Sequence, residues 1–163
     1  MKIFHRPVFC RYGNQGCEGG WPLKALLYVR DNQGLDTEES YPYMTKMGYC
    51  HYNRKYIGSL IKQIYRTQTG SEQSLAMCIA GYGPIAVAVD ATEMMSYSGG
   101  IYSNLRCNPQ NLNHAVTVVG YTPDSWLIKN SWDTSWGEQG YMRLARNKGN
   151  MCGVAMNGVF PVV

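Results

Sequence analysis

Two residues of the C-terminal half, His114 and Asn130, have side chains that can cooperate in acid–base chemistry. A histidine can take up and return a proton near neutral pH, and an amide oxygen can hold its imidazole in one tautomer. His114 stands before one apolar, β-branched run, and Asn130 stands after the next. Two such runs predict an antiparallel hairpin, whose ends lie side by side, so we expect the two side chains to meet. The simpler alternative is that His114 is only a packed or surface residue and that Asn130 belongs to a turn.

The six cysteines are the other residues that could do chemistry. None has the C-x-x-C spacing of a zinc or redox site, and we expect neither a metal nor a cofactor. A cysteine becomes a nucleophile when a helix N-terminus or a neighbouring cation lowers the pKa of its thiol. Cys78 instead shares the apolar side of a predicted helix with Leu75 and Ile79, where a free cysteine serves as a small buried hydrophobe.

The apolar pattern predicts two helices in the first half of the chain. The first runs from Trp21 to Val29, with Pro22 in its first turn. The second starts at Thr69, where the Thr-x-x-Glu pattern to Glu72 predicts a capping box, and continues to Gly81. Short strands follow, expected at residues 85–89, 100–102, 115–121, 126–130, 140–145 and near 159. Helices followed by an antiparallel sheet favour an α+β fold over a doubly wound one.

The bulk composition limits the classes of protein that this sequence can encode. Its 163 residues suit one domain or slightly less, and 45% hydrophobic with 16% charged residues excludes disorder. The net charge of +4 comes without a basic run, so we expect no nucleic-acid partner. No segment approaches the ~18–20 apolar residues of a membrane span, and the first ten residues lack the apolar core of a signal peptide.

Several short motifs, in one order along the chain, resemble the papain-like cysteine proteases, with the cathepsin L, K and S group as the nearest match. They are Gly16-Cys17-Glu18-Gly19-Gly20, Tyr41-Pro42-Tyr43, Gly83-Pro84, Asn113-His114-Ala115, Asn130-Ser131-Trp132, Trp136-Gly137 and Asn150-Met151-Cys152-Gly153. The resemblance covers about residues 10–163. It implies a papain-like two-lobe α+β fold, truncated at its N-terminus, with a remnant of the helical left lobe and crossover at about 10–82 and the β-sheet right lobe at about 83–163.

The resemblance implies a role for each matching position. His114 would be the general base and acid, Asn130 would orient it, and Trp132 and Trp136 would shield their contact from water. The implied substrate-binding residues are Gly19, Gly20, Trp21, Pro22, Ala88, Leu112, Ala115 and Asn157. Simpler roles stay open, namely a tight turn for the glycines and core packing for Trp132. The implied disulfides join Cys10 to Cys50 and Cys107 to Cys152.

The sequence departs from the family pattern at two places. The nucleophile of the family lies in a Cys-Gly-Ser-Cys-Trp-type motif on a helix, preceded by a glutamine that contributes to the oxyanion hole, and this sequence contains neither. Cys17 would then lack its usual partner. Asp133 stands where the family usually has a glycine.

We therefore expect a cysteine-type endopeptidase domain that is inactive as an isolated chain. A non-catalytic module that binds peptides or protease inhibitors is the alternative, and a relic that does not fold is the third. The expected partners are polypeptide substrates, cystatin-like inhibitors or a separate chain that carries the nucleophile, with no nucleic acid and no membrane. The resemblance implies a lysosomal or extracellular location, where disulfides persist.

Overall fold

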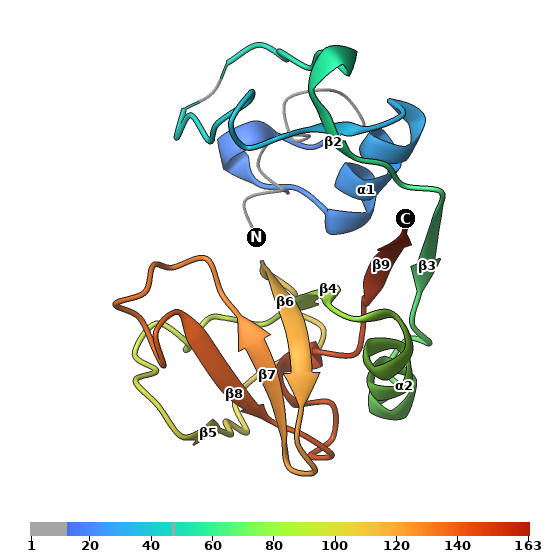
Figure 1. The fold of residues 1–163 in the computed structure, drawn as a ribbon. Coiled ribbons are helices and arrows are strands. Elements are labelled where there is room, and N and C mark those ends of the chain that lie inside the picture. The colour runs from blue at the N-terminus through green and yellow to red at the C-terminus, as the bar shows by residue number, and fades with distance from the viewer. Residues whose placement is uncertain (1–12, 47) are drawn as a thin grey trace. The chain divides into compact units, whose positions relative to one another are not determined.

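The computed structural model describes residues 13–46 and 48–163, which form two compact units (Figure 1). The larger unit comprises Arg66–Phe160, and the smaller one runs up to Tyr65 and includes Pro161–Val163. The predicted boundary between a left-lobe remnant and the right lobe, near residue 82, stays a prediction.

The smaller unit contains one α-helix and a short two-stranded sheet. Its elements are η3 (Gly16–Glu18), α1 (Pro22–Asp31), β1 (Leu35–Asp36), η4 (Arg54–Tyr56) and β2 (Ile57–Ser59), and β1 pairs with β2 in antiparallel fashion. Proline suits the first turn of α1 because an N–H there would have no partner within the helix. The chain leaves α1 through Gly34, whose φ of 144° favours glycine and whose N–H donates to the Val29 carbonyl at 3.0 Å.

The larger unit combines one α-helix with most of a seven-stranded sheet. Its elements are α2 (Glu72–Tyr82), β4 (Ile85–Val89), β5 (Ile101–Tyr102), β6 (His114–Tyr121), β7 (Ser125–Lys129), β8 (Tyr141–Ala145) and η5 (Met151–Gly153), and β3 (Gln63–Arg66) and β9 (Val159–Val162) complete the sheet. The strand order is β3-β9-β4-β6-β7-β8-β5. Every predicted strand is present. The sheet is mostly antiparallel, as expected for the predicted α+β fold, but at one edge β5 pairs with β8 in parallel.

The start of α2 also differs from the prediction. The N-cap is Ser71, whose side-chain oxygen accepts the Ser74 N–H at 3.1 Å, so the capping box between Thr69 and Glu72 is wrong. Glu72 is the first residue of the helix, and its carboxylate accepts hydrogen bonds from the Trp126 indole and from the backbone N–H groups of Asn147 and Asn150. These distant donors occupy the carboxylate that a capping box would have used locally.

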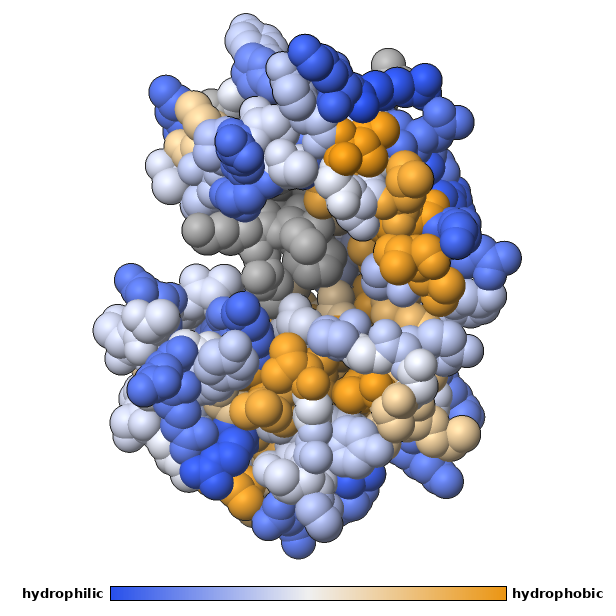
Figure 2. All heavy atoms as spheres, viewed as in Figure 1, coloured by the Kyte–Doolittle hydropathy of each residue, from blue (hydrophilic) through white to orange (hydrophobic). Residues whose placement is uncertain are grey.

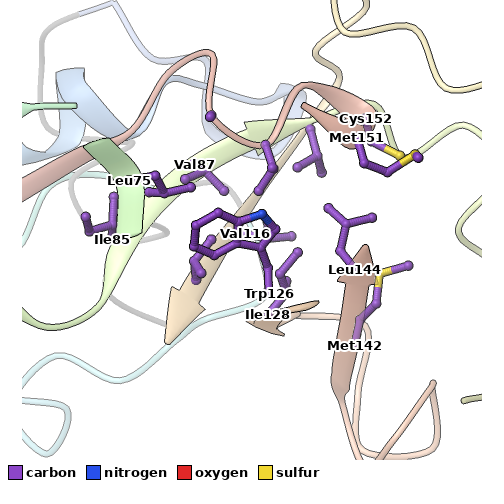
Figure 3. Close-up of a cluster of buried hydrophobic side chains, with 14 of the residues drawn as sticks. Leu75, Ile85, Val87, Val116, Trp126, Ile128, Met142, Leu144, Met151 and Cys152 are labelled. Carbon is purple, nitrogen blue, oxygen red and sulfur yellow. The ribbon is translucent and has the colours of Figure 1, made fainter. Parts of the chain in front are cut away.

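The hydrophobic core of the larger unit lies around Trp126 of β7, which is completely buried (Figure 3). β4 is buried at all five positions, as expected for a strand between two others inside a packed domain. Full burial of each large aliphatic side chain contributes about 1.5–3 kcal/mol, so this cluster holds the strands that carry the site. In Figure 2 polar residues cover much of the visible surface, with apolar residues between them. One of the exposed apolar side chains of the chain is Leu127 of β7, which is 38% exposed.

Candidate active site

The β6–β7 hairpin brings His114 and Asn130 together. His114 is the first residue of β6, and Asn130 directly follows Lys129, the last residue of β7. The strands pair in antiparallel register, with Thr117 opposite Lys129, so the start of one lies beside the end of the other. The His114 Nε2 atom lies 2.8 Å from the Asn130 Oδ1 atom, which is a hydrogen-bond distance.

The neighbouring backbone determines which atom donates in this hydrogen bond. The Ser131 N–H also points at the Asn130 Oδ1 atom, at 2.8 Å. A backbone N–H can only donate, so the atom that receives it must be the amide oxygen rather than the amide nitrogen. The His114 Nε2 atom therefore carries the proton and donates it to the same oxygen. In the neutral imidazole the Nδ1 atom is then the unprotonated nitrogen that can act as a base.

Burial and hydrogen bonding act in opposite directions on the pKa of His114. Desolvation lowers this pKa below its ordinary value of 6.5, and the hydrogen bond to Asn130 raises it by a smaller amount. Asn130 itself is only 8% exposed, so its oxygen is held in place by the protein. The net lowering keeps the imidazole neutral near pH 7, which is the form that can accept a proton.

One tryptophan covers a face of the imidazole, and a second packs against the first. The Trp132 ring stacks on the His114 ring with centroids 4.7 Å apart and an interplanar angle of 27°. Trp136 meets Trp132 edge to face at 5.1 Å, and its indole N–H points at the carbonyl oxygens of Met94 and Met95, both at 3.2 Å. A ring stacked on the imidazole keeps water from one face, which strengthens a hydrogen bond in low dielectric. Trp132 also packs against the hydrophobic core, so the packing role is present, and the shielding role stays a prediction.

Asp133 follows Trp132 with a backbone conformation that favours glycine. Its φ is 73°, in the left-handed region, where aspartate is tolerated better than most residues. Its Oδ1 atom accepts the N–H of Thr134 at 2.5 Å. This local hydrogen bond accounts for an aspartate at a position where the family usually has glycine.

The two glycines of the predicted substrate strand lie in the smaller unit and are constrained differently. A Cβ on Gly19 would meet nothing within 4 Å, so the space beside this backbone is open. A Cβ on Gly20 would come within 2.6 Å of the Asn14 side chain, whose Oδ1 atom accepts the Trp21 N–H at 2.8 Å. Gly19 therefore gives free access to the backbone, whereas Gly20 permits close internal packing. Trp21 is 48% exposed, and Pro22 is buried at the start of α1.

The remaining predicted substrate residues belong to the larger unit. Ala88 of β4 and Ala115 of β6 are paired directly across the sheet, one residue from His114. Leu112 packs close to Gly153, where a Cβ would come 2.7 Å from its Cδ2 atom, and Asn157 is exposed. A specificity pocket built from these residues together with those of the smaller unit stays a prediction.

The cysteines occupy three kinds of environment. Cys107 and Cys152 form a disulfide, as the resemblance implies. Cys50 is also disulfide-bonded, and its expected partner, Cys10, lies outside the described residues. Cys17 and Cys78 are free thiols, the first exposed and the second packed against the hydrophobic core. Within the described residues no group of three or more His, Cys, Asp or Glu could hold a metal ion, and none of the described helices is long and apolar enough to span a membrane.

Asp90 is a residue of this region that the sequence interpretation missed. It follows β4 directly, is 4% exposed, and accepts hydrogen bonds from Thr92, Asn108 and Asn113. Burial raises its pKa, but these hydrogen bonds outweigh burial and the net pKa is lowered, so the carboxylate is charged. The available signal was a lone acidic residue at the end of an entirely apolar strand.

Comparison with known proteins places the chain in one family. The sequence model of the family described as papain family cysteine protease matches residues 5–162 of this chain. A cathepsin L-like protein of Caenorhabditis elegans is 44% identical over 160 residues, which are 94% of this chain and 48% of that protein. Digestive cysteine proteinase 1 of Homarus americanus is 46% identical over 158 residues, 93% of this chain and 49% of that protein. The chain thus spans about half the length of these curated relatives.

Solved structures agree with this assignment. Digestive procathepsin L 3 of the Tenebrio molitor larval midgut superposes with a TM-score of 0.91 at 40% identity, over 98% of this chain and 54% of that one. Bromelain of Ananas comosus, in complex with the E64 inhibitor, superposes with a TM-score of 0.85 at 31% identity, over 97% of this chain and 76% of that one. The matched family model and the papain-like fold together show that the chain belongs to the papain family of cysteine proteases.

Proposed function

We propose that this chain is the acid–base and substrate-strand part of a papain-like cysteine endopeptidase, which hydrolyses peptide bonds through a thioester acyl-enzyme. The observation that supports this most is the pair of hydrogen bonds on the Asn130 Oδ1 atom, from His114 Nε2 and from the Ser131 N–H. They leave the His114 Nδ1 atom as the base, with Trp132 stacked on the ring.

The chemistry of such a site follows from this tautomer. The Nδ1 atom takes the proton from a cysteine thiol, and the resulting thiolate attacks the peptide carbonyl carbon. The C–N bond breaks as Nδ1 returns the proton to the leaving amine. In the second half Nδ1 takes a proton from water, the hydroxide attacks the thioester, and the thiol leaves with that proton.

These steps need a nucleophilic cysteine, and the sequence does not contain the family motif that carries it. Cys78 packs against the hydrophobic core, and Cys17 belongs to η3 rather than to the N-terminus of an α-helix. We therefore propose that the isolated chain does not cleave peptides. A longer product or a separate chain would provide the nucleophile.

A covalent thiol probe of the E64 type separates the two parts of this proposal. The isolated chain should show no labelling that depends on His114 and no cleavage of a quenched fluorescent peptide. Fusion to the nucleophile-bearing segment of a relative should create both activities, and His114→Ala should abolish them. Labelling of Cys17 or Cys78 that requires His114 would overturn the proposed inactivity, and a fused chain without peptidase activity would overturn the proposed function.

A non-catalytic binding module is the second candidate, favoured by the open space beside Gly19 and the half-exposed Trp21. It predicts that the isolated chain binds a cystatin-like inhibitor or an extended peptide and that His114→Ala leaves this affinity unchanged. Absence of binding in a calorimetric titration would remove it. For either candidate we propose a lysosomal or extracellular location, because family members such as the Homarus and Tenebrio enzymes are named digestive and the chain carries disulfides.

A further inference from the structure

The end of β4 lies against the beginning of β6, at the point where His114 enters the sheet. Val89, the last residue of β4, is paired with His114 in the antiparallel register. Asp90 is therefore the first residue beyond the partner of the imidazole, and its side chain is buried. A charged carboxylate is rarely buried unless several donors compensate for the lost hydration.

The donors to Asp90 all come from two segments that flank the entrance of β6. Its Oδ1 atom accepts the Thr92 hydroxyl at 2.6 Å, the Thr92 N–H at 3.1 Å and the Asn113 amide at 3.1 Å. Its Oδ2 atom accepts the Asn108 N–H at 2.7 Å. Asn113 in turn accepts the Ala91 N–H at 2.9 Å, so the two segments are joined in both directions.

The segment from Cys107 to Asn113 has no helix or strand that could fix it in place. The disulfide to Cys152 holds its first residue, and β6 begins directly after its last one. Between these points the carboxylate of Asp90 bonds to the backbone at Asn108 and to the side chain of Asn113, the residue before His114. These two hydrogen bonds tie the loop to the end of β4 directly before the chain enters β6.

We propose that Asp90 is a positioning residue for His114, which holds the loop of residues 108–113 so that the imidazole meets the Asn130 oxygen. The importance of this role for catalysis rests on the proposed function, but the role itself concerns only groups of the larger unit. The alternative is that the Cys107–Cys152 disulfide and the sheet suffice to hold the loop. A second alternative is that Asp90 acts on His114 through its charge.

The direction in which the pKa of His114 changes distinguishes these possibilities. Desolvation is the larger influence on this pKa, and Asn130 the smaller. If the loop loosens, the imidazole regains water and loses Asn130, and because desolvation is the larger influence the pKa rises. Removal of a nearby negative charge alone would lower the pKa instead. A general loss of stability would leave the pKa of the folded state unchanged.

The experiment is a ¹⁵N NMR titration of His114 in the chain and in three variants, together with the exchange rate of the Nε2–H proton. Asp90→Asn keeps the size of the side chain but weakens its acceptance of hydrogen bonds. Asn113→Ala removes the side-chain hydrogen bonds of Asn113 to Asp90, Ala91 and Thr92, at an exposed position outside the core. Glu72→Gln is the matched control, because Glu72 also accepts several hydrogen bonds but none from the loop of residues 108–113.

We expect both Asp90→Asn and Asn113→Ala to raise the pKa of His114 and to accelerate exchange of its Nε2–H by about tenfold or more, the equivalent of one lost charge-assisted hydrogen bond. Glu72→Gln should leave both quantities unchanged. If Asp90→Asn does not fold, Asn113→Ala decides alone. Unchanged values, a lowered pKa, or an equal effect of Glu72→Gln would each overturn the inference. An inactive fused enzyme with the expected NMR changes would reject only the proposed function.

Discussion

Asn130 offers a direct test of the geometry, because two substitutions of it should move the pKa of His114 in opposite directions. Asn130→Ala removes an oxygen that raises this pKa through its hydrogen bond, while the larger desolvation effect stays, so the pKa should fall further. Asn130→Asp keeps the oxygen and adds a negative charge 2.8 Å from the Nε2 atom, so the pKa should rise.

The expected loss of stability follows from the groups that each substitution leaves without a partner. In Asn130→Ala the Ser131 N–H and the His114 Nε2–H lose the oxygen that both use. A buried donor without a partner costs about 1–3 kcal/mol, and since both residues are partly open to water, we expect about 1–3 kcal/mol in total. That is a large part of a total stability of about 5–15 kcal/mol. Asn130→Asp should cost less, because the acceptor remains.

The assay is an NMR titration of the imidazole combined with urea unfolding at pH 7.5. Asn53→Ala is a suitable control, since Asn53 also accepts a backbone N–H, from Lys55 at 3.0 Å, but it lies in the smaller unit and caps η4. It should lower stability slightly and leave the pKa of His114 unchanged. The reasoning is refuted if the Ala and Asp variants at position 130 shift this pKa in the same direction.

Three further substitutions test other contacts. Glu138→Gln removes an ion pair with Arg143. Hydrogen bonds, that to Arg143 first, lower the pKa of Glu138 from 4.5 to about 2. The ion pair therefore stabilises the folded state fully above pH 4.5 and loses this effect as the pH falls through about 2. Because the pair is partly exposed, the variant should show a small fall in the urea midpoint at pH 7, and this difference should shrink as the pH falls through about 2. Gly20→Ala should cost about 1–3 kcal/mol in the same assay, because its Cβ would overlap Asn14; an unchanged midpoint would contradict this packing. Glu72→Ala leaves the buried Trp126 N–H without its acceptor, so the midpoint temperature of thermal unfolding should fall by roughly 2–4 °C for each kcal/mol of stability lost.

Local patterns were sufficient to predict the elements that carry His114 and Asn130. Both flank a hairpin whose apolar runs and central turn lie within one continuous segment, and the structure has both strands in that place. The meeting of the hairpin ends follows from antiparallel pairing alone. The chemistry of the tautomer could not be predicted in this way, because it depends on where the Ser131 N–H points.

The features that sequence reasoning missed all depend on contacts between distant segments. Thr69 and Ser71 are both residue types that cap helices, and Ser71 is the cap. The Glu72 carboxylate, which the predicted capping box required, instead bonds to residues more than fifty positions away. The parallel pairing of β5 with β8 likewise joins segments that no local pattern relates. Asp90 is one acidic residue without periodicity, and its importance appears only when Asn108 and Asn113 are placed beside it.

Two carboxylates of the larger unit, those of Asp90 and Glu138, keep their charge over the pH range in which His114 begins to take up a proton. Hydrogen bonds lower the pKa of Asp90 and that of Glu138, so both carboxylates stay charged in mildly acidic solution. The pKa of His114 is lowered as well, by desolvation, which extends the neutral form to lower pH. A histidine with a lowered pKa destabilises the folded state as the pH falls from 6.5 through its folded value, because the unfolded chain binds the proton more readily. The loss of stability that begins as the pH falls below 6.5 therefore comes from His114 before Asp90 or Glu138 takes up a proton.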